Sequence, residues 1–332
     1  MNIGNSDLKE IAKVIKGASK IALFPHVNMD GDAFGSCVAL AHALRELGKE
    51  CRIFISEEVP ENLSFLDPEK ILQTNNKDDI KDYSLAVMVD CGEMKRIPGR
   101  EEVFDSFSST LCIDHHGTTE SCCQFNYIDP MAAATGQIVF DLINELILME
   151  GKEPSKEAKK EIANAIFAAI TTDTGNYQYS NTQKESHEIT ARLYDWGLEG
   201  NKVSVEIYES NRIERIRLTA EVLSKVEILA EGKVALAYCS QEMLKTTGAK
   251  MEETEWIAGD LRGIRGVEVA IFLKEEGEKA IKCSLRSKAY YDVAKLATEF
   301  GGGGHIRAAG YTTYKDLKEA IEEIKERVQK DF

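Results

Sequence analysis

The sequence lacks the features of several large protein classes. It has no C-x-x-C pair, and no apolar stretch approaches the roughly 20 residues that a membrane-spanning helix needs. Most of its 8 cysteines stand inside apolar runs, as reduced core thiols do, which argues against a zinc knuckle or a disulfide framework. The N-terminus has no signal-peptide core either. We therefore expect a soluble cytoplasmic protein that does not act at a membrane.

Basic residues are scarce relative to acidic ones. The chain has 41 Lys and Arg against 56 Asp and Glu, which gives a net charge of −15. Such an exterior repels the phosphates of a long duplex, so we do not expect a broad basic face that binds long nucleic acid. Small anions would have to be held by local arginines or by metal ions. With 332 residues, of which 43% are hydrophobic, the chain is long enough for two domains.

In the first half of the chain, short apolar runs alternate with helical patterns. Ile21–Phe24, Leu85–Val89 and Leu111–Ile113 are predicted to be buried strands, and Lys156–Ile170 is predicted to be a helix. This alternation predicts an α/β fold whose N-terminal domain has a mainly parallel, doubly wound sheet covered on both faces.

The pattern changes in the second half of the chain. The segment from Ser186 to Leu223 is helical and charged, and beyond it Val226–Leu229 and Val234–Tyr238 are spaced as a hairpin. We predict a smaller C-terminal α+β domain here. The expected organisation is a catalytic domain over residues 1–188, a helical connector over residues 189–223, and a substrate-binding domain over residues 224–332.

Side chains that can bind metal ions follow the predicted strands and helix. The carboxyl ends of parallel strands meet at one edge of a sheet, so we expect these side chains to converge in one cleft. Carboxylates packed together repel one another unless cations compensate, although each cluster alone would suit an ordinary turn. Together they predict a site for two divalent ions, with manganese favoured by the imidazoles and magnesium as the alternative. The residues are His26, Asp30, Asp32, Asp90, Asp114, His115, His116 and Asp173.

Several segments of the chain resemble the motifs of the DHH phosphoesterase family. Within that family, they resemble the subgroup of bifunctional oligoribonuclease and pAp phosphatases, or nanoRNases. One departure from the family pattern is Met29, where proline is common. The second half resembles the DHH-associated domain. The matching segments are His26-Val-Asn-Met-Asp-Gly-Asp-Ala33, Val89-Asp90, Asp114-His115-His116, Thr172-Asp173, Ser284-Leu-Arg-Ser287 and Gly301-Gly-Gly-Gly-His-Ile-Arg-Ala-Ala-Gly310.

The resemblance implies a role for each of these side chains. Asp90 would bridge two metal ions, Asp114 would orient the histidines, and His116 would face the substrate phosphate and stabilise developing charge. These three residues form the predicted catalytic set. The other metal ligands would divide into one set for each ion, His26 with Asp30, and Asp32 with His115 and Asp173.

A second group of residues is predicted to hold the substrate away from the metals. A glycine run could be a flexible linker, but Gly301–Gly304 is short and lies between a predicted helix and Ala308-Ala-Gly310. Glycines let backbone N–H groups come close to an anion. The predicted substrate-binding residues are Arg286, Ser287, Gly303, Gly304 and His305.

The favoured function is hydrolysis of short oligonucleotides (nanoRNA) and of pAp through two-metal activation of water. The expected partners are short single-stranded RNA or DNA and mononucleotide bisphosphates. A phosphodiesterase for pApA or cyclic-di-AMP is the alternative, because it would use the same residues. An inorganic pyrophosphatase is less favoured, because pyrophosphate has no base that the second domain could hold. A non-catalytic nucleotide sensor is also less favoured, because every expected ligand position is filled. The sequence leaves open the physiological substrate, the cleavage polarity, the cellular metal and the formation of a homodimer.

Overall fold

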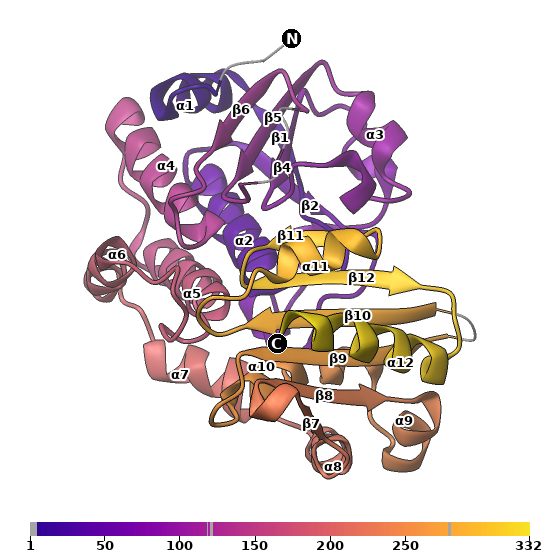
Figure 1. Ribbon diagram of the computed structural model, residues 1–332. Helices are drawn as coiled ribbons and strands as arrows, with labels where there is room; N and C mark the ends of the chain where they lie inside the picture. Colours follow the sequence, from indigo (N-terminus) through magenta and orange to yellow (C-terminus); the bar gives the residue numbers. More distant parts are fainter. Residues whose placement is uncertain (1–4, 118, 120–121, 278–279) are drawn as a thin grey trace. The chain divides into compact units, whose positions relative to one another are not determined.

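The computed structural model describes residues 5–117, 119, 122–277 and 280–332. The chain divides into two compact units, residues 1–210 and 211–332 (Figure 1). The division falls inside the segment 189–223 that was predicted as a connector, because helix α6 (Lys184–Asp195) packs in the first unit and helix α8 (Ile213–Leu223) in the second. None of the helices that the structure describes has the length and apolar character needed to span a lipid bilayer.

The first unit contains a six-stranded sheet in the order β3-β2-β1-β4-β5-β6, and every neighbouring pair of strands is parallel. This confirms the predicted α/β fold with a parallel sheet. All five positions of the central strand β4 are buried, as expected for a strand covered on both faces. The strands are β1 (Lys20–Phe24), β2 (Glu50–Phe54), β3 (Gln73–Thr74), β4 (Leu85–Val89), β5 (Ser109–Asp114) and β6 (Phe125–Ile128).

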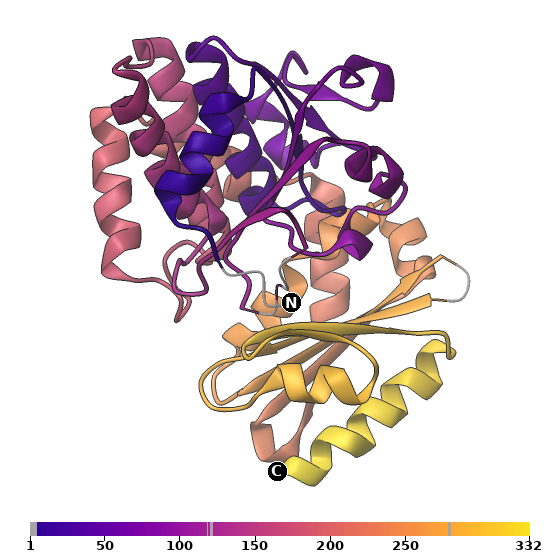
Figure 2. The same ribbon diagram turned by 90° about the horizontal axis from the view of Figure 1, so that it is seen from above.

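Helices cover both faces of this sheet (Figures 1 and 2). Helices α2 and α5 make the most extensive helix contact of the unit, and α4 packs against both. On the other face, Phe104 of α3 and Phe24 of β1 belong to one apolar cluster, with their rings edge to face at 5.1 Å. The helices are α1 (Leu8–Gly17), α2 (Gly31–Glu46), α3 (Glu101–Asp105), α4 (Thr135–Glu150), α5 (Lys156–Asp173), α6 and α7 (Gly200–Ser204), the last followed by a π-helical turn, Val205–Glu209.

The strand order has a switch point between β1 and β4, where its direction reverses. From β1 the chain moves outward to β2 and β3, then returns to place β4 on the other side of β1. The connections that leave β1 and β4 therefore diverge, and a ligand can enter between them at the carboxyl ends of the strands. Helix α2 begins there, because the Asp30 side chain accepts a hydrogen bond from the Ala33 amide at 2.9 Å and caps the helix.

The second unit contains a mixed sheet in the order β11-β12-β10-β9-β8-β7, in which only the β8–β9 pair is parallel. One apolar cluster lies between the sheet and helices α11 and α12, and another lies between the sheet and helices α8, α9 and α10. The strands are β7 (Glu227–Leu229), β8 (Val234–Cys239), β9 (Val269–Glu276), β10 (Ala280–Ser287), β11 (Gly303–His305) and β12 (Ala308–Thr313), and the remaining helices are α9 (Gln241–Thr247), α10 (Ile257–Gly263), α11 (Val293–Glu299) and α12 (Leu317–Val328).

The glycine run forms regular structure as well as a turn. Gly303–His305 is an edge strand paired with β12. The sequence analysis did not predict β12, because most of its residues are small and form no strand pattern. A Cβ at Gly302 would overlap the carbonyl oxygen of Gly310, and one at Gly304 would lie 2.6 Å from that of Ala308. Close packing against β12 therefore requires glycine at these two positions. A Cβ at Gly303 would meet no atom within 4 Å, so the backbone is open to a close approach there.

Candidate metal centre

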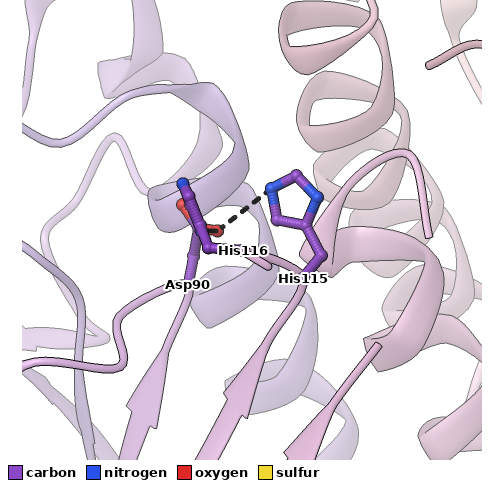
Figure 3. Close-up of side chains that lie close together, drawn as sticks. All are labelled: Asp90, His115 and His116. Carbon is purple, nitrogen blue, oxygen red and sulfur yellow. Dashed lines mark ion pairs between the residues drawn. The ribbon is translucent and has the colours of Figure 1, made fainter. Parts of the chain in front are cut away.

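Asp90 lies at the centre of the candidate site. It follows β4 directly, is 1% exposed, and has a left-handed backbone conformation with φ of 56°. That conformation costs free energy in a residue other than glycine, and such residues concentrate at functional sites. The hydroxyl of Thr135 donates a hydrogen bond to Asp90 Oδ1 at 2.8 Å. Asp90 Oδ2 lies 3.4 Å from His26 Nε2. Asp90 Oδ1 lies 3.7 Å from His115 Nε2, and Figure 3 draws this pair.

The predicted metal ligands gather around Asp90 in overlapping groups. In each of three groups, one potential ligand atom per residue lies within 4.8 Å of the others. His115 Nε2 lies 3.5 Å from Asp173 Oδ2 and 3.7 Å from Asp32 Oδ2. The structure thus brings together residues that are far apart in the chain, although their roles as ligands stay a prediction. The groups are His26, Asp30 and Asp90; Asp32, His115 and Asp173; and Asp90, His115 and His116.

Two of the histidines are oriented as metal-binding histidines are. The Nδ1 atom of His26 lies 2.7 Å from the carbonyl oxygen of Val27, and that of His115 lies 3.1 Å from the carbonyl oxygen of Ala132. A proton on Nδ1, donated to the carbonyl, leaves the Nε2 lone pair for a metal ion. Among the described residues, His26 Nε2 is buried and has no hydrogen-bond partner. A divalent cation would satisfy this nitrogen and the carboxylates that face it, so the residues fit the ions.

Asp32 is held by residues that the sequence analysis missed. Its carboxylate accepts hydrogen bonds from the backbone N–H groups of Thr135 at 2.7 Å and Gly136 at 2.9 Å, at the start of α4. The hydroxyl of Ser36 donates a third, at 3.0 Å. The first turn of a helix favours a negative charge, so α4 fixes the orientation of Asp32. A Cβ at Gly136 would lie 2.6 Å from the Cβ of Ala169. Close packing therefore requires glycine at this position, directly before the apolar residues of α4.

Asp114 connects the two histidines that follow it. Its Oδ1 accepts hydrogen bonds from the His115 amide at 2.8 Å, the His116 amide at 3.2 Å and His116 Nδ1 at 2.7 Å. Its Oδ2 accepts a short hydrogen bond from the Thr119 hydroxyl. Asp114 is fully buried, so these bonds both satisfy its charge and fix the direction of the imidazoles. Sequence reasoning also missed Thr119, since a Thr in a loop carries no local signal.

The electrostatics of the centre suit the binding of cations. Burial alone would lower the pKa of His115, but the carboxylates of Asp173, Asp32 and Asp90 outweigh it and raise the pKa to about 9. Burial also raises the pKa of Asp173, to about 6, although His115 acts in the opposite direction. Protons on these side chains offset part of the negative charge when metal ions are not bound, and bound cations would replace them.

We expect metal binding to release protons and to strengthen as the pH rises. A ligating imidazole must be neutral, and the raised pKa of His115 means that its proton must leave at any pH below about 9. Calorimetric titration of the metal-free protein with Mn²⁺ at neutral pH, in buffers of different ionisation enthalpy, should show the release of roughly one to two protons. Binding with no proton release would contradict the placing of His115 among the ligands.

The predicted substrate-binding residues lie at one end of β10 and on the edge strand β11, and β12 lies between these two strands. Ser287 is buried, and its backbone N–H donates to the carbonyl oxygen of Arg307 at 3.0 Å. Arg286 pairs with Ala308 of β12 and is partly exposed. The structure places the backbone of His305 in β11 opposite Ala308, and its side chain lies outside the described part of the chain.

Glu268 supports this end of the sheet and was not foreseen. Its carboxylate is 4% exposed and accepts hydrogen bonds from the backbone N–H groups of Ala289 (3.0 Å), Tyr290 (2.7 Å) and Tyr291 (2.8 Å). The guanidinium of Arg307 donates to the carbonyl oxygen of Tyr291 at 2.8 Å. Several charge-assisted hydrogen bonds therefore fix the loop that follows Ser287. Because these amides are occupied by Glu268, they are not the groups that would bind a phosphate.

Fold and site together define a class of protein. A parallel sheet whose switch point carries buried aspartates and histidines that could hold a metal ion, joined to a second α+β unit, suits a phosphoester hydrolase. The chain belongs to the DHH family: residues 20–170 match the model of the DHH family N-terminal domain, and residues 231–330 match the DHHA1 domain. The predicted family is thereby confirmed, and the protein is an enzyme that hydrolyses phosphoester bonds.

Relatives are similar to the chain over almost its whole length. The chain is 32% identical to the bifunctional oligoribonuclease and PAP phosphatase NrnA of Thermus thermophilus, with 97% of this chain and 93% of that protein covered. It is 26% identical to the Bacillus subtilis protein of the same name, over 92% and 93%. Among solved structures, an exopolyphosphatase-related protein from Bacteroides fragilis superposes with a TM-score of 0.88 at 26% identity, over 97% of this chain and 95% of that one.

Proposed function

We propose that this protein is a metal-dependent phosphodiesterase and phosphatase that hydrolyses short oligonucleotides and pAp. The observation that carries the proposal is the position of Asp90 between two sets of ligands, within reach of His26 on one side and His115 on the other. A carboxylate so placed can bridge two cations. The similarity to two proteins named as oligoribonucleases and PAP phosphatases supports this choice of substrates.

Each residue of the centre has a task in this proposal. His26 and Asp30 would hold one divalent ion, Asp32, His115 and Asp173 would hold the other, and Asp90 would be shared between them. Two bound ions would supply an activated water for attack on phosphorus and positive charge to offset that of the phosphoryl oxygens. Manganese is favoured over magnesium because the set combines imidazoles with carboxylates and contains no thiolate.

His116 acts on the substrate in the same proposal. Burial lowers its pKa, but the hydrogen bond to Asp114 and the charge of Asp90 raise it above the usual value overall. The hydrogen bond to Asp114 therefore makes the ring easier to protonate than that of a free histidine. A positive charge held in this position can stabilise the charge that develops on the phosphoryl oxygens as the bond to the leaving oxygen breaks.

The second unit holds the far end of the substrate. Arg286, Ser287, His305 and the open backbone at Gly303 bind a phosphate or a terminal base. A guanidinium can bind phosphate oxygens in a bidentate manner, and glycine allows backbone N–H groups to come close to an anion. Long nucleic acid would gain nothing further from a protein with a net charge of −15.

A panel of substrates tests the proposal. The metal-loaded protein is assayed on pyrophosphate, pAp, pApA, cyclic-di-AMP and RNA of two to ten nucleotides. We expect the highest kcat/KM on pAp and the shortest RNAs, with a decline as length increases. A clear preference for pApA or cyclic-di-AMP over other short RNAs would favour the signalling-nucleotide function, a preference for pyrophosphate would favour a pyrophosphatase, and binding without turnover would favour a sensor.

Replacing His116 by alanine should slow the chemical step and leave both metal ions bound. The substitution removes a group that stabilises charge, an effect that typically amounts to about 10²–10³-fold in kcat. Single-turnover hydrolysis measures the step, and elemental analysis counts the ions in the same sample. His42, a partly buried histidine of α2 outside the centre, supplies the control His42→Ala, which should behave as the wild type. Loss of a metal ion from His116→Ala would place His116 among the ligands instead.

A further inference from the structure

The segment between β1 and α2 carries two members of one potential metal-binding group, His26 and Asp30. Oδ1 of Asp30 is occupied by the helix cap, and its Oδ2 lies 3.9 Å from His26 Nε2. The segment has no regular secondary structure, and the side chain of Asp30 is 55% exposed. Side-chain packing alone therefore does not fix Asp30, and the position of its backbone decides how well it converges with His26 on one cation.

A buried arginine holds the backbone directly before His26. Arg100, the residue before α3, is 3% exposed, and its guanidinium donates hydrogen bonds to the carbonyl oxygens of Pro25 at 2.9 Å and of Phe54 at 2.7 Å. Phe54 is the last residue of β2, and Pro25 directly follows β1. The guanidinium therefore joins the ends of two neighbouring strands, one residue before His26.

No ion pair accounts for the burial of Arg100. Within the described part of the chain, its guanidinium pairs with no carboxylate, and its Nε atom has no hydrogen-bond partner. Burial lowers the pKa of Arg100, whereas the charge of Glu57 acts to raise it. A buried charge with so few partners costs free energy. The planar guanidinium can, however, donate to two carbonyls of different segments in one fixed geometry. Holding the two strand ends is therefore the task that its contacts indicate.

A glutamate holds the backbone directly before Asp30. Oε1 of Glu57, in the segment that follows β2, accepts a hydrogen bond from the backbone N–H of Met29 at 3.2 Å. Met29 is 4% exposed, so this N–H needs an acceptor within the protein. The family pattern commonly has proline at this position, and proline has no N–H group. The contact with Glu57 therefore depends on the residue that this chain has there.

We propose that Arg100 and Glu57 are positioning residues, which hold His26 and Asp30 in place at one metal site and strengthen the binding of that ion alone. The inference rests on the two-ion centre proposed above. Each of the two residues contacts the backbone of the position immediately before a ligand. Contacts of this kind fix the direction of the side chain that follows, and so reduce the cost of bringing the ligands together.

The other potential metal-binding group has supports of its own. The Asp32 carboxylate accepts hydrogen bonds from two backbone N–H groups at the start of α4. Nδ1 of His115 lies 3.1 Å from the carbonyl oxygen of Ala132, in the loop before α4. These contacts come from a different part of the chain than Arg100 and Glu57. Loss of either positioning residue should therefore affect one ion and leave the other in place.

Calorimetric titration of the metal-stripped protein with Mn²⁺ tests this proposal without a substrate. We expect the wild type to bind two ions and Glu57→Ala to bind one of them about 10–100-fold more weakly, the usual effect of losing an outer contact of a ligand. Glu57→Gln should bind both ions about as the wild type does, because its amide oxygen still accepts the Met29 N–H. The matched control is Glu58→Ala, which removes an exposed carboxylate from the adjacent position and should change neither affinity.

Two further variants show which ion is affected. In Asp173→Ala, which lacks a ligand of the other group, adding Glu57→Ala should weaken the binding of the remaining ion by the same factor. In His26→Ala the remaining ion is that of the other group, and adding Glu57→Ala should have no effect on its binding. Arg100→Lys keeps the positive charge but loses the fork that reaches both carbonyl oxygens, so it should weaken the same ion as Glu57→Ala does.

Thermal unfolding separates positioning from a general loss of stability. Metal-free Glu57→Ala should unfold close to the wild-type temperature, and its rise in Tm on addition of Mn²⁺ should be smaller than that of the wild type. Unchanged binding of both ions by Glu57→Ala, equal weakening of both, or no recovery in Glu57→Gln would overturn the proposal and leave the proposed function standing. A wild type that binds a single ion would overturn the two-ion centre together with this proposal.

Discussion

Asp90→Ala abolishes turnover and lowers the metal content, if the account of the centre is correct. Asp90 is 1% exposed and lies within 3.7 Å of histidines from both groups, so its removal deprives two ions of a ligand at once. The expected loss of kcat exceeds that for His116→Ala, which removes no ligand. Elemental analysis and a phosphodiesterase assay on the same preparation measure both effects.

The control for this variant is Asp129→Ala, which changes an Asp between β6 and α4 that belongs to none of the potential metal-binding groups found among the described residues. It should retain both metal ions and near-normal turnover. Circular dichroism checks that Asp90→Ala is folded. A folded Asp90→Ala protein with full metal content and near-normal activity would refute the assignment of Asp90 as the shared ligand.

The second large effect concerns the length of the substrate. If Arg286 and His305 hold the far end of the substrate, then Arg286→Ala and His305→Ala should raise KM for dinucleotides and short RNA. They should also lower kcat where the remote binding energy positions the phosphate. Hydrolysis of a nitrophenyl phosphodiester, which has no second nucleotide, should barely change. Steady-state kinetics on both kinds of substrate measure the contrast.

Lys295→Ala is the matched control for Arg286→Ala, because it removes a positive charge from the same unit at a side chain that is 84% exposed and lies on α11. It should leave both substrates unaffected. Equal losses on dinucleotides and on the nitrophenyl ester in Arg286→Ala would mean that Arg286 acts at the reacting centre or in folding. The idea that the second unit measures substrate length would then be abandoned.

The sequence predicted the strands that place the potential metal ligands, and there is a physical reason for this success. Leu85–Val89 is uniformly apolar and ends abruptly at Asp90, and the structure gives β4 these same bounds. Buried parallel strands followed by polar residues are local patterns, so one strand and its exit can be recognised without knowledge of its neighbours. The convergence of the exits then follows from the strand order of a parallel sheet.

The supporting residues could not be predicted in the same way. Thr135 donates to Asp32 across 103 positions of sequence, and Glu268 accepts from Tyr290 across 22 positions. Such contacts depend on how the elements pack, and a threonine or glutamate carries no local signal of them. Strand β12 was missed for a related reason, because the alternation of Ala, Gly and Thr is too weakly apolar to predict a strand.

The most direct test of the central claim is a metal titration of activity. Metal-stripped protein at a concentration well above the dissociation constants is titrated with Mn²⁺, and hydrolysis of a dinucleotide is measured at each addition. Because Asp90 joins two sets of ligands, we predict almost no activity without metal and a rise that reaches its plateau at two equivalents of Mn²⁺ per chain. A plateau at one equivalent, or full activity in the stripped protein, would contradict the two-ion centre.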